Sequence, residues 1–291
     1  MTSLKHEGMQ PLSSDEIRMA IEASLAEDIG TGDVTTLATV PENAQATAAI
    51  CAREPIVVAG VAFAIEAFRT LSREIDAVEQ CADGQRIPPG SSILNLRGQA
   101  RAILTAERVA LNFVQRLSGV ATLTRLFVDA IAGSKARILD TRKTTPGWRR
   151  FEKYAVACGG GQNHRAGHYD MVLIKDNHLA ALRAEQPNAI AAAINRARKA
   201  YPNLKVEVEA DNLKQVTQAV EAGADIILLD NMPPEALRAA VQLVNGRAKL
   251  EASGGVNLDT VRAIAETGVD FISVGALTHS ARAVDIGLDF D

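Results

Sequence analysis

The sequence predicts an α/β barrel that follows a smaller domain of mixed helices and strands, in a chain of 291 residues. Three observations predict this fold class. After residue 135, short apolar runs alternate with amphipathic helical stretches, and the last four runs start about 20 to 24 residues apart. Each of these runs ends in polar or small residues. Before residue 105, short β-like runs are separated by turns, which is typical of antiparallel pairing.

A helix is predicted after a loose tail of about ten residues. Ser13 and Glu16 have the spacing of a capping box, so Ser13 is the expected N-cap. Gly30 and Gly32 stop this helix. The following β-like runs cover 47–52, 55–59, 75–81, 93–96 and 100–104, with one helix over 62–71.

A long helix then leads from the first domain to the second. It is predicted from Thr105 towards Ile131, with a break at Ser118-Gly119. The six clear barrel strands are 136–139, 171–174, 206–208, 226–229, 250–252 and 271–274, and the helices between them are 189–201, 213–222, 234–244 and 258–267. A seventh strand is expected near 154–161, where the pattern is weak.

The residues at the strand ends favour a barrel over a doubly wound sheet. In a barrel, the carboxyl ends of all strands meet at one rim, and every predicted strand here ends in polar or small residues. A doubly wound sheet would concentrate its site at one switch point, and a dinucleotide fold would carry G-x-G-x-x-G after the first strand. That motif is missing.

Composition and charge narrow the class of protein. With 47% apolar and 23% charged residues the chain is not disordered, and no apolar stretch or leader suggests a membrane span or secretion. Three cysteines favour reduced thiols and a cytosolic location. Although the net charge is −4, residues 137–183 hold nine Lys/Arg against four Asp/Glu. This basic segment indicates a small anionic ligand or, alternatively, a solvated face.

The predicted rim combines cations with glycine turns. Its cations are Arg142, Lys143, His164, Arg165 and Lys175. Arginine matches carboxylates and phosphates in a two-pronged geometry, so these residues favour a ligand with several negative charges. Ser253-Gly254-Gly255 and Gly275-Ala276 follow the last two strands, where backbone N–H groups and helix N-termini commonly bind phosphate. Alternatively, these glycines only allow tight turns and bind no phosphate.

Glu209 and Asp230 end consecutive strands. Neighbouring carboxylates beside a phosphate site suit Mg²⁺, held by one or two carboxylates and by ligand oxygens. An acid–base pair, or simple pairing with the nearby cations, would use the same residues.

Three further motifs have weaker interpretations. His164 and His168 have the spacing of a zinc pair but lack the helical H-E-x-x-H context. Cys158 adjoins three glycines and is expected to be a structural thiol rather than a nucleophile. Lys175 could form a Schiff base if its pocket were dry and its pKa depressed.

Several motifs together resemble those of quinolinate phosphoribosyltransferase, and they cover nearly the whole chain in order. The motifs are Glu27-Asp-Ile-Gly-Thr-Gly-Asp-Val-Thr-Thr, Glu107-Arg-Val-Ala-Leu-Asn-Phe, Asp140-Thr-Arg-Lys-Thr-Thr-Pro-Gly, Gly160-Gly-Gln-Asn-His-Arg, Leu173-Ile-Lys-Asp-Asn-His, Val206-Glu-Val-Glu, Leu228-Leu-Asp-Asn, Glu251-Ala-Ser-Gly-Gly and Val274-Gly-Ala-Leu-Thr-His. The resemblance departs from the family pattern at Trp148, where Leu or Phe is expected, and at His168, where Leu is expected.

The resemblance implies an N-terminal α/β sandwich over 1–118, completed by the tail 280–291, and an incomplete seven-stranded α/β barrel over 119–279. It also implies a cytoplasmic homodimer, which could assemble further into hexamers, with Arg108 reaching into the partner's site. The implied reaction joins quinolinate to phosphoribosyl pyrophosphate with Mg²⁺ and gives nicotinate mononucleotide, pyrophosphate and CO₂, a step of NAD biosynthesis.

By resemblance, each rim residue has an expected role. Arg142, Lys143, His164, Arg165 and the partner's Arg108 would hold the two quinolinate carboxylates. Lys175 would contact the ribosyl or pyrophosphate group, and Glu209 and Asp230 would bind ribose hydroxyls directly or through Mg²⁺. Ser253, Gly254 and Gly275 would cradle the 5′-phosphate. The residues expected to act in catalysis are Lys143, Lys175, Glu209 and Asp230.

Three other functions remain open at this point. A paralogue of the same fold could use a different acceptor, although Arg142, His164 and Arg165 favour quinolinate. A Schiff-base lyase would use Lys175. A nucleotide-binding or nucleic-acid-binding module would use the basic segment, but only 4% of the residues are aromatic and could stack on bases.

Overall fold

The computed structural model describes residues 11–290, so the predicted N-terminal tail lies outside the described part. Two compact units form. Among the described residues, the first comprises 11–125, 146–160 and 280–290, and the second comprises 126–145 and 161–279. None of the described helices is both long and apolar enough to cross a membrane.

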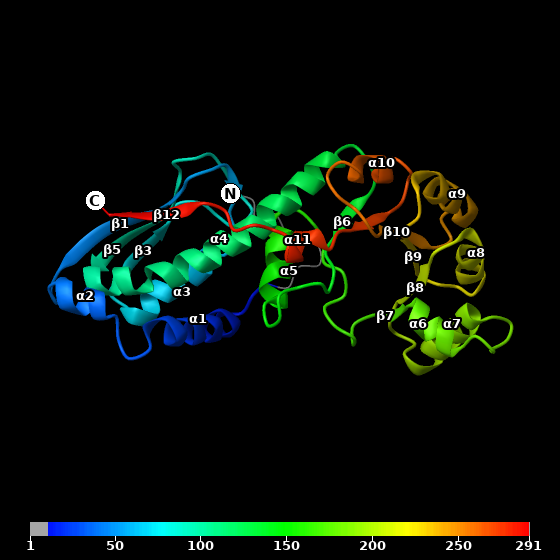
Figure 1. Cartoon of the computed structure of the whole chain (residues 1–291), viewed down its shortest axis with the longest axis horizontal. Coiled ribbons are helices and arrows are strands. Elements are labelled where there is room, and N and C mark those ends of the chain that lie inside the picture. The colour runs from blue at the N-terminus through cyan, green and yellow to red at the C-terminus, as the bar shows by residue number, and fades with distance from the viewer. Residues whose placement is uncertain (1–10, 291) are drawn as a thin grey trace. The chain divides into compact units, whose positions relative to one another are not determined.

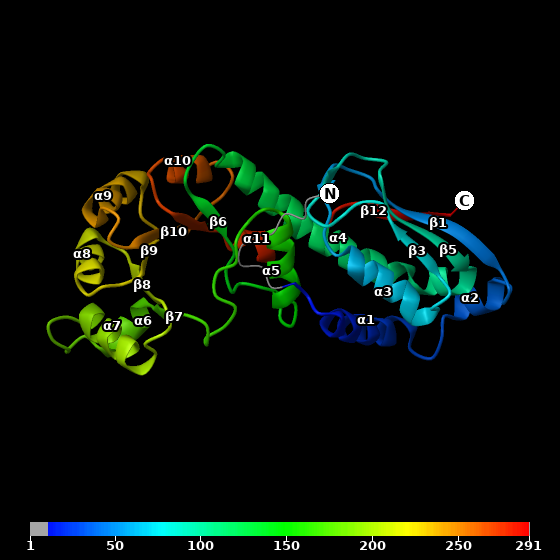
Figure 2. The same ribbon diagram turned by 180° about the vertical axis from the view of Figure 1, so that it is seen from behind.

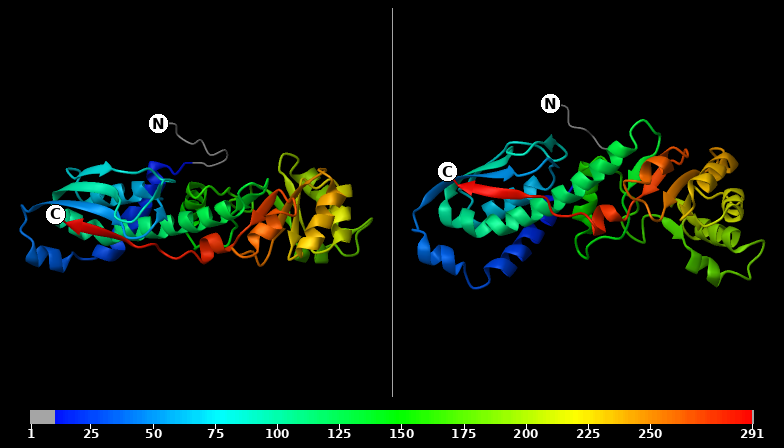
Figure 3. Two further views of the ribbon diagram at one scale, coloured as in Figure 1. Left: turned by 90° about the horizontal axis from the view of Figure 1, so that it is seen from above. Right: turned by 45° about the horizontal axis from the view of Figure 1, so that its top comes forward.

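The first unit is built on an antiparallel sheet. Its helices are α1 (Ser14–Ile29), α2 (Val34–Thr39), α3 (Val61–Leu71), α5 (Arg149–Cys158) and most of α4 (Ala100–Ala130). Its strands are β1 (Gln45–Ala52), β2 (Ile56–Val57), β3 (Asp76–Glu79), β4 (Arg86–Ile87), β5 (Ser92–Gln99) and β12 (Ile286–Phe290). The sheet order is β12-β1-β5-β3, while β2 and β4 form a separate pair. The C-terminal strand therefore closes this sheet beside β1 (Figure 3).

Local chemistry explains α1. The Ser13 side chain accepts a hydrogen bond from the Glu16 backbone N–H, and the Glu16 carboxylate accepts one from the Ser13 N–H at 2.8 Å. The predicted capping box is confirmed, and Gly30 ends the helix as expected.

Two predictions for the first unit are wrong. Residues 100–104 are not a strand, because β5 leads directly into α4. Four of these five residues, two alanines, an arginine and a leucine, are good helix formers. Nor does α4 break at Ser118-Gly119. A β-carbon at Gly119 would lie 2.0 Å from the Arg282 carbonyl oxygen, so this glycine serves close packing inside a continuous helix.

Trp148 also lies in the first unit. Its ring stacks on Phe113 with 4.8 Å between ring centroids and meets Phe151 edge-on. Trp148, where the family pattern has Leu or Phe, is therefore an aromatic residue that packs inside this unit.

The second unit is a parallel α/β sheet. Its strands are β6 (Arg137–Leu139), β7 (Val172–Ile174), β8 (Val206–Ala210), β9 (Ile226–Asp230), β10 (Lys249–Ser253) and β11 (Phe271–Ser273), in the order β6-β11-β10-β9-β8-β7. Its helices are α6 (Asp176–Ala181), α7 (Ala189–Ala200), α8 (Leu213–Glu221), α9 (Pro234–Val244), α10 (Val261–Ala265) and α11 (Ala276–His279). In Figure 1, α7 to α10 lie along the outer side of the strands.

The six predicted barrel strands and their order along the chain are confirmed, and the architecture is an incomplete α/β barrel. Strands β6 and β7 are its two edges (Figure 2). A seventh strand over 154–161 is wrong, because residues up to Cys158 belong to α5. Instead, Gln162 forms a single parallel bridge with Leu139 at the free edge of β6. One bridge gives this segment far less backbone support than a strand ladder would.

Candidate active site

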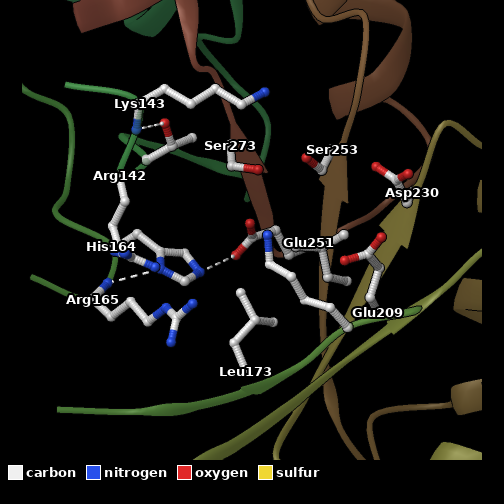
Figure 4. Close-up of a pocket in the computed structure, with 13 residues that line it drawn as sticks. Arg142, Lys143, His164, Arg165, Leu173, Glu209, Asp230, Glu251, Ser253 and Ser273 are labelled. Atoms are coloured by element: carbon white, nitrogen blue, oxygen red, sulfur yellow. Dashed lines mark hydrogen bonds and ion pairs between the residues drawn. The ribbon is translucent and has the colours of Figure 1, made fainter. Parts of the chain in front are cut away.

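A cavity of about 370 Å³ opens at the carboxyl ends of the barrel strands. It is lined by Thr141, Arg142, Lys143, His164, Arg165, Leu173, Lys175, Glu209, Leu228, Asp230, Glu251, Ser253 and Ser273. Figure 4 shows cations on one side and the carboxylates of Glu209 and Asp230 on the other. All five predicted rim cations and both predicted rim carboxylates are thus brought together, as the barrel interpretation requires.

The remaining predicted residues have different positions. Ser253 lines the cavity, and Gly254 follows it directly. Gly275 is close by, since a β-carbon there would lie 3.0 Å from Lys143 Cδ. Arg108 is an exposed residue of α4 in the first unit, so its role in a partner's site stays a prediction.

The cationic side holds two guanidinium groups with different surroundings. Arg142 Nη2 lies 2.7 Å from His168 Nε2, while Arg142 Nε is buried and meets no hydrogen-bond partner among residues 11–290. Burial and the neighbouring charge of Arg142 lower the pKa of Arg165. Packed cations of this kind repel one another, and a bound anion relieves that repulsion.

Lys143 is fixed through its backbone. Its N–H donates to Thr141 Oγ1 at 3.0 Å, and its carbonyl oxygen accepts from Thr278 Oγ1 at 2.8 Å. The exposed Lys143 side chain extends from this anchored backbone to the cavity (Figure 4).

The acidic side is made by two adjacent strands. Glu209 is in β8 and Asp230 ends β9, and the register places Asp230 opposite Ser253 of β10. Burial, then the charge of Asp230, raise the pKa of Glu209, whereas Lys175 lowers it. A divalent cation between these carboxylates would relieve their repulsion, so the donor set fits Mg²⁺ with ligand oxygens.

The glycine turn after β10 is tight. Gly254 has φ +92°, and a β-carbon there would lie 2.1 Å from Asn231 Oδ1. Only glycine therefore lets the backbone pass here, next to Ser253 and Asp230. The two helices whose N-termini were expected to assist phosphate binding are short: α10 spans five residues and α11 spans four.

The weaker motifs can now be judged. His168 meets Arg142, and His164 meets Glu207 and Glu251, so the two histidines do not form a zinc pair. Burial raises the pKa of the Cys158 thiol well above its usual range, which suits a structural thiol. Lys175 is exposed and lines the same open cavity as Glu209, so it lacks the dry surroundings of a Schiff-base lysine.

Comparisons with known proteins agree with this geometry. The model of the quinolinate phosphoribosyl transferase N-terminal domain matches residues 33–118, and that of the C-terminal domain matches residues 120–289. The chain belongs to the quinolinate phosphoribosyltransferase family. Both domain models match in the expected order, and together they cover almost all of the described chain.

Individual relatives match over nearly their full length. The nicotinate-nucleotide pyrophosphorylase [carboxylating] of Mycobacterium leprae is 45% identical, over 94% of this chain and 97% of its own. The probable nicotinate-nucleotide pyrophosphorylase [carboxylating] of Bacillus subtilis is 42% identical, over 94% and 93% respectively. The structure of the Francisella tularensis nicotinate-nucleotide pyrophosphorylase superposes with a TM-score of 0.92, at 42% identity, covering 99% of this chain and 100% of that one.

Sequence reasoning missed two carboxylates of this family member. Glu251 is part of the cavity lining and Glu207 lies next to His164 of that lining; they are 1% and 0% exposed. Each precedes a rim residue by two positions, Glu209 in β8 and Ser253 in β10. Because side chains alternate along a strand, a spacing of two places Glu207 on the same face of β8 as Glu209, and Glu251 on the same face of β10 as Ser253. The available signal was the repeated Glu in Val-Glu-Val-Glu.

His168 was also missed as a neighbour of Arg142, and it gives a testable effect. Replacing His168 with leucine, the residue expected in the family pattern, should raise the KM for the acidic substrate about 3- to 10-fold with little change in kcat, because one hydrogen bond that orients Arg142 is lost. Steady-state kinetics would measure this. His168→Gln keeps an acceptor and should recover most of the affinity, whereas an unchanged KM in His168→Leu would refute the orienting role.

Proposed function

We propose that the chain catalyses transfer of the phosphoribosyl group from phosphoribosyl pyrophosphate to quinolinate, with loss of CO₂, to give nicotinate mononucleotide in NAD biosynthesis. The observation that carries the proposal is one cavity that joins Arg142, Arg165, Lys143 and Lys175 to an adjacent carboxylate pair in a member of this family. A dicarboxylate and a polyphosphate both need such an excess of cations. Several relatives carry names that state the carboxylating reaction.

The two ends of the cavity suit the two substrates. Arg142, Lys143, His164 and Arg165 would hold the quinolinate carboxylates. Ser253, Gly254 and Gly275 would hold the 5′-phosphate, and Lys175 would contact the ribosyl or pyrophosphate group. Orienting two bound reactants in this way removes much of the entropic barrier to their reaction.

The chemistry then proceeds in two steps. The ring nitrogen forms a bond to the ribose carbon as the bond from that carbon to pyrophosphate breaks. Carboxylates of Glu209 and Asp230 would stabilise the positive charge on the ribose, and Mg²⁺ held there would neutralise charge on the phosphate oxygens. The alkylated ring nitrogen is cationic, so it accepts the electrons left when the adjacent carboxyl group departs as CO₂, and a proton takes its place.

Omitting single components tests this proposal. Product is expected from quinolinate, phosphoribosyl pyrophosphate and Mg²⁺ together, and chelation of the metal should remove it reversibly. A paralogous activity would appear as turnover of phosphoribosyl pyrophosphate with another aromatic acid and none with quinolinate. Activity that persists after thorough chelation would refute the role given to Mg²⁺.

The protein is further proposed to act as a homodimer, in which Arg108 of the partner subunit completes the quinolinate site. Arg108 is exposed on α4, as a residue that serves another subunit must be. Mixing inactive Arg108→Ala with inactive Arg142→Ala protein should restore about a quarter of wild-type activity after subunit exchange, because half of the dimers are then mixed and each holds one intact site. Activity measured before and after exchange checks this, and no recovery in dimers shown to be mixed would refute the shared site.

A further inference from the structure

The cavity lining includes part of a cluster with two carboxyl groups to which the proposed reaction gives no role. The cluster consists of Glu207 of β8, Glu251 of β10 and His164. Nε2 of His164 lies 3.0 Å from Glu207 Oε2 and 3.4 Å from Glu251 Oε2. Figure 4 shows the imidazole of His164 reaching towards Glu251 from the opposite side of the cavity floor.

The imidazole stabilises both carboxylates. Glu207 is fully buried and Glu251 is 1% exposed, and burying a carboxylate is costly unless a donor meets it. Apart from this imidazole and from each other, the two carboxyl groups meet no hydrogen-bond partner in the part of the chain that the structure describes. The three side chains lie within 4.8 Å of one another, and Nε2 contacts both carboxyl groups directly.

The other ring nitrogen is also used inside the protein. The backbone N–H of Arg165 donates to His164 Nδ1 at 2.8 Å. Because Nδ1 accepts this hydrogen bond it carries no proton, so the proton of the ring lies on Nε2 and faces the two carboxyl groups.

The same segment is anchored at a second point. The His164 backbone N–H donates to Asp140 Oδ1 at 2.8 Å, and Asn163 Nδ2 donates to Asp140 Oδ2 at 2.7 Å. Asp140 itself is fully buried. Because the ladder to β6 consists of the one bridge at Gln162, side chains must supply most of the support for the segment that carries Arg165.

We propose that Glu207 and Glu251 are positioning residues for quinolinate binding, which act through His164 to place the backbone and guanidinium of Arg165. In this account His164 links the barrel strands to the loop that carries Arg165. The inference rests on the proposed function, because it concerns the acceptor end of that site. Phosphoribosyl pyrophosphate binding uses Ser253 and the carboxylate pair and should not depend on this link.

Calorimetric titration of the full chain with quinolinate and, separately, with phosphoribosyl pyrophosphate tests this. Glu207→Met and Glu251→Met remove the acceptor, so the Kd for quinolinate should rise about tenfold while the Kd for phosphoribosyl pyrophosphate changes less than about twofold. Glu207→Gln and Glu251→Gln keep an acceptor oxygen and should stay within about threefold of wild type. Asp225→Asn is the control, since Asp225 Oδ2 accepts from the Val206 N–H at the opposite end of the strands.

A double-mutant comparison separates positioning from direct binding. Adding Glu251→Met to a His164→Asn variant should weaken quinolinate binding no further, because both changes remove the same link. Additive losses, unchanged quinolinate binding in the methionine variants, or equal weakening of both ligands would overturn the inference. If a methionine variant fails to fold, Glu207→Asp and Glu251→Asp replace it. These shorter side chains keep the charge but move the carboxylate away from His164, so the Kd for quinolinate should again rise. Wild-type protein that binds phosphoribosyl pyrophosphate but not quinolinate would overturn the proposed function instead.

Discussion

Replacing Arg142 with alanine is expected to lower kcat/KM by about 10³-fold or more, the loss typical when a desolvated charged partner is removed from a bound anion. Arg142 lines the cavity, and its buried Nε meets no hydrogen-bond partner in the described residues, so its donors are available to a carboxylate. Steady-state kinetics with each substrate varied in turn would measure the loss, which should appear mainly as weaker use of quinolinate.

Two further variants serve as controls for Arg142→Ala. Arg142→Lys keeps the charge without the planar fork and should recover only part of the activity. Arg238→Ala removes an exposed arginine of α9 that is not part of the cavity lining, and should leave activity unchanged. Circular dichroism should show that Arg142→Ala is folded. Wild-type turnover by folded Arg142→Ala would remove Arg142 from the substrate site.

Replacing both rim carboxylates with their amides is expected to reduce kcat by about 10²- to 10³-fold, because the positive charge that develops on the ribose loses its stabilising partners. Glu209→Gln and Asp230→Asn preserve side-chain shape, so folding should be retained. The apparent affinity for Mg²⁺ should fall at the same time, and metal-dependent kinetics would measure both effects together.

The matched control is Glu221→Gln, which removes an exposed carboxylate at the end of α8 and should change neither quantity. If the double variant kept wild-type kcat and the same dependence on Mg²⁺, Glu209 and Asp230 would have no part in the reaction. A lower Mg²⁺ affinity with unchanged kcat at saturating metal would leave them only a binding role.

The barrel could be predicted well because its strands are apolar runs bounded by clear turn and helix signals. The strands ending at Asp230 and Ser253 were placed to within one or two residues. The mistakes arose where the local pattern suits two structures. Ala100 begins a helix directly after β5, and Gly119 reads as a break although it permits close packing. Both outcomes depend on tertiary contacts that no local window contains.

In the site, too, some contacts could be predicted from the sequence and others could not. Placing Arg142, Lys175, Glu209 and Asp230 at one rim needs only the strand ends and the rule that parallel strands share an edge. The link from His164 to Glu207 and Glu251 joins a loop to two strands across the barrel interior, and it depends on which face each strand turns inward. The contact between Arg142 and His168 depends on a loop conformation.

The most direct test of the account uses quinolinate labelled with ¹³C in the carboxyl group next to the ring nitrogen. Purified protein would be incubated with this substrate, phosphoribosyl pyrophosphate and Mg²⁺, and mass spectrometry would follow the nucleotide and the gas. The account predicts unlabelled nicotinate mononucleotide and one labelled CO₂ for each nucleotide formed. Folded protein that forms no nucleotide, or a nucleotide that keeps the label, would contradict it.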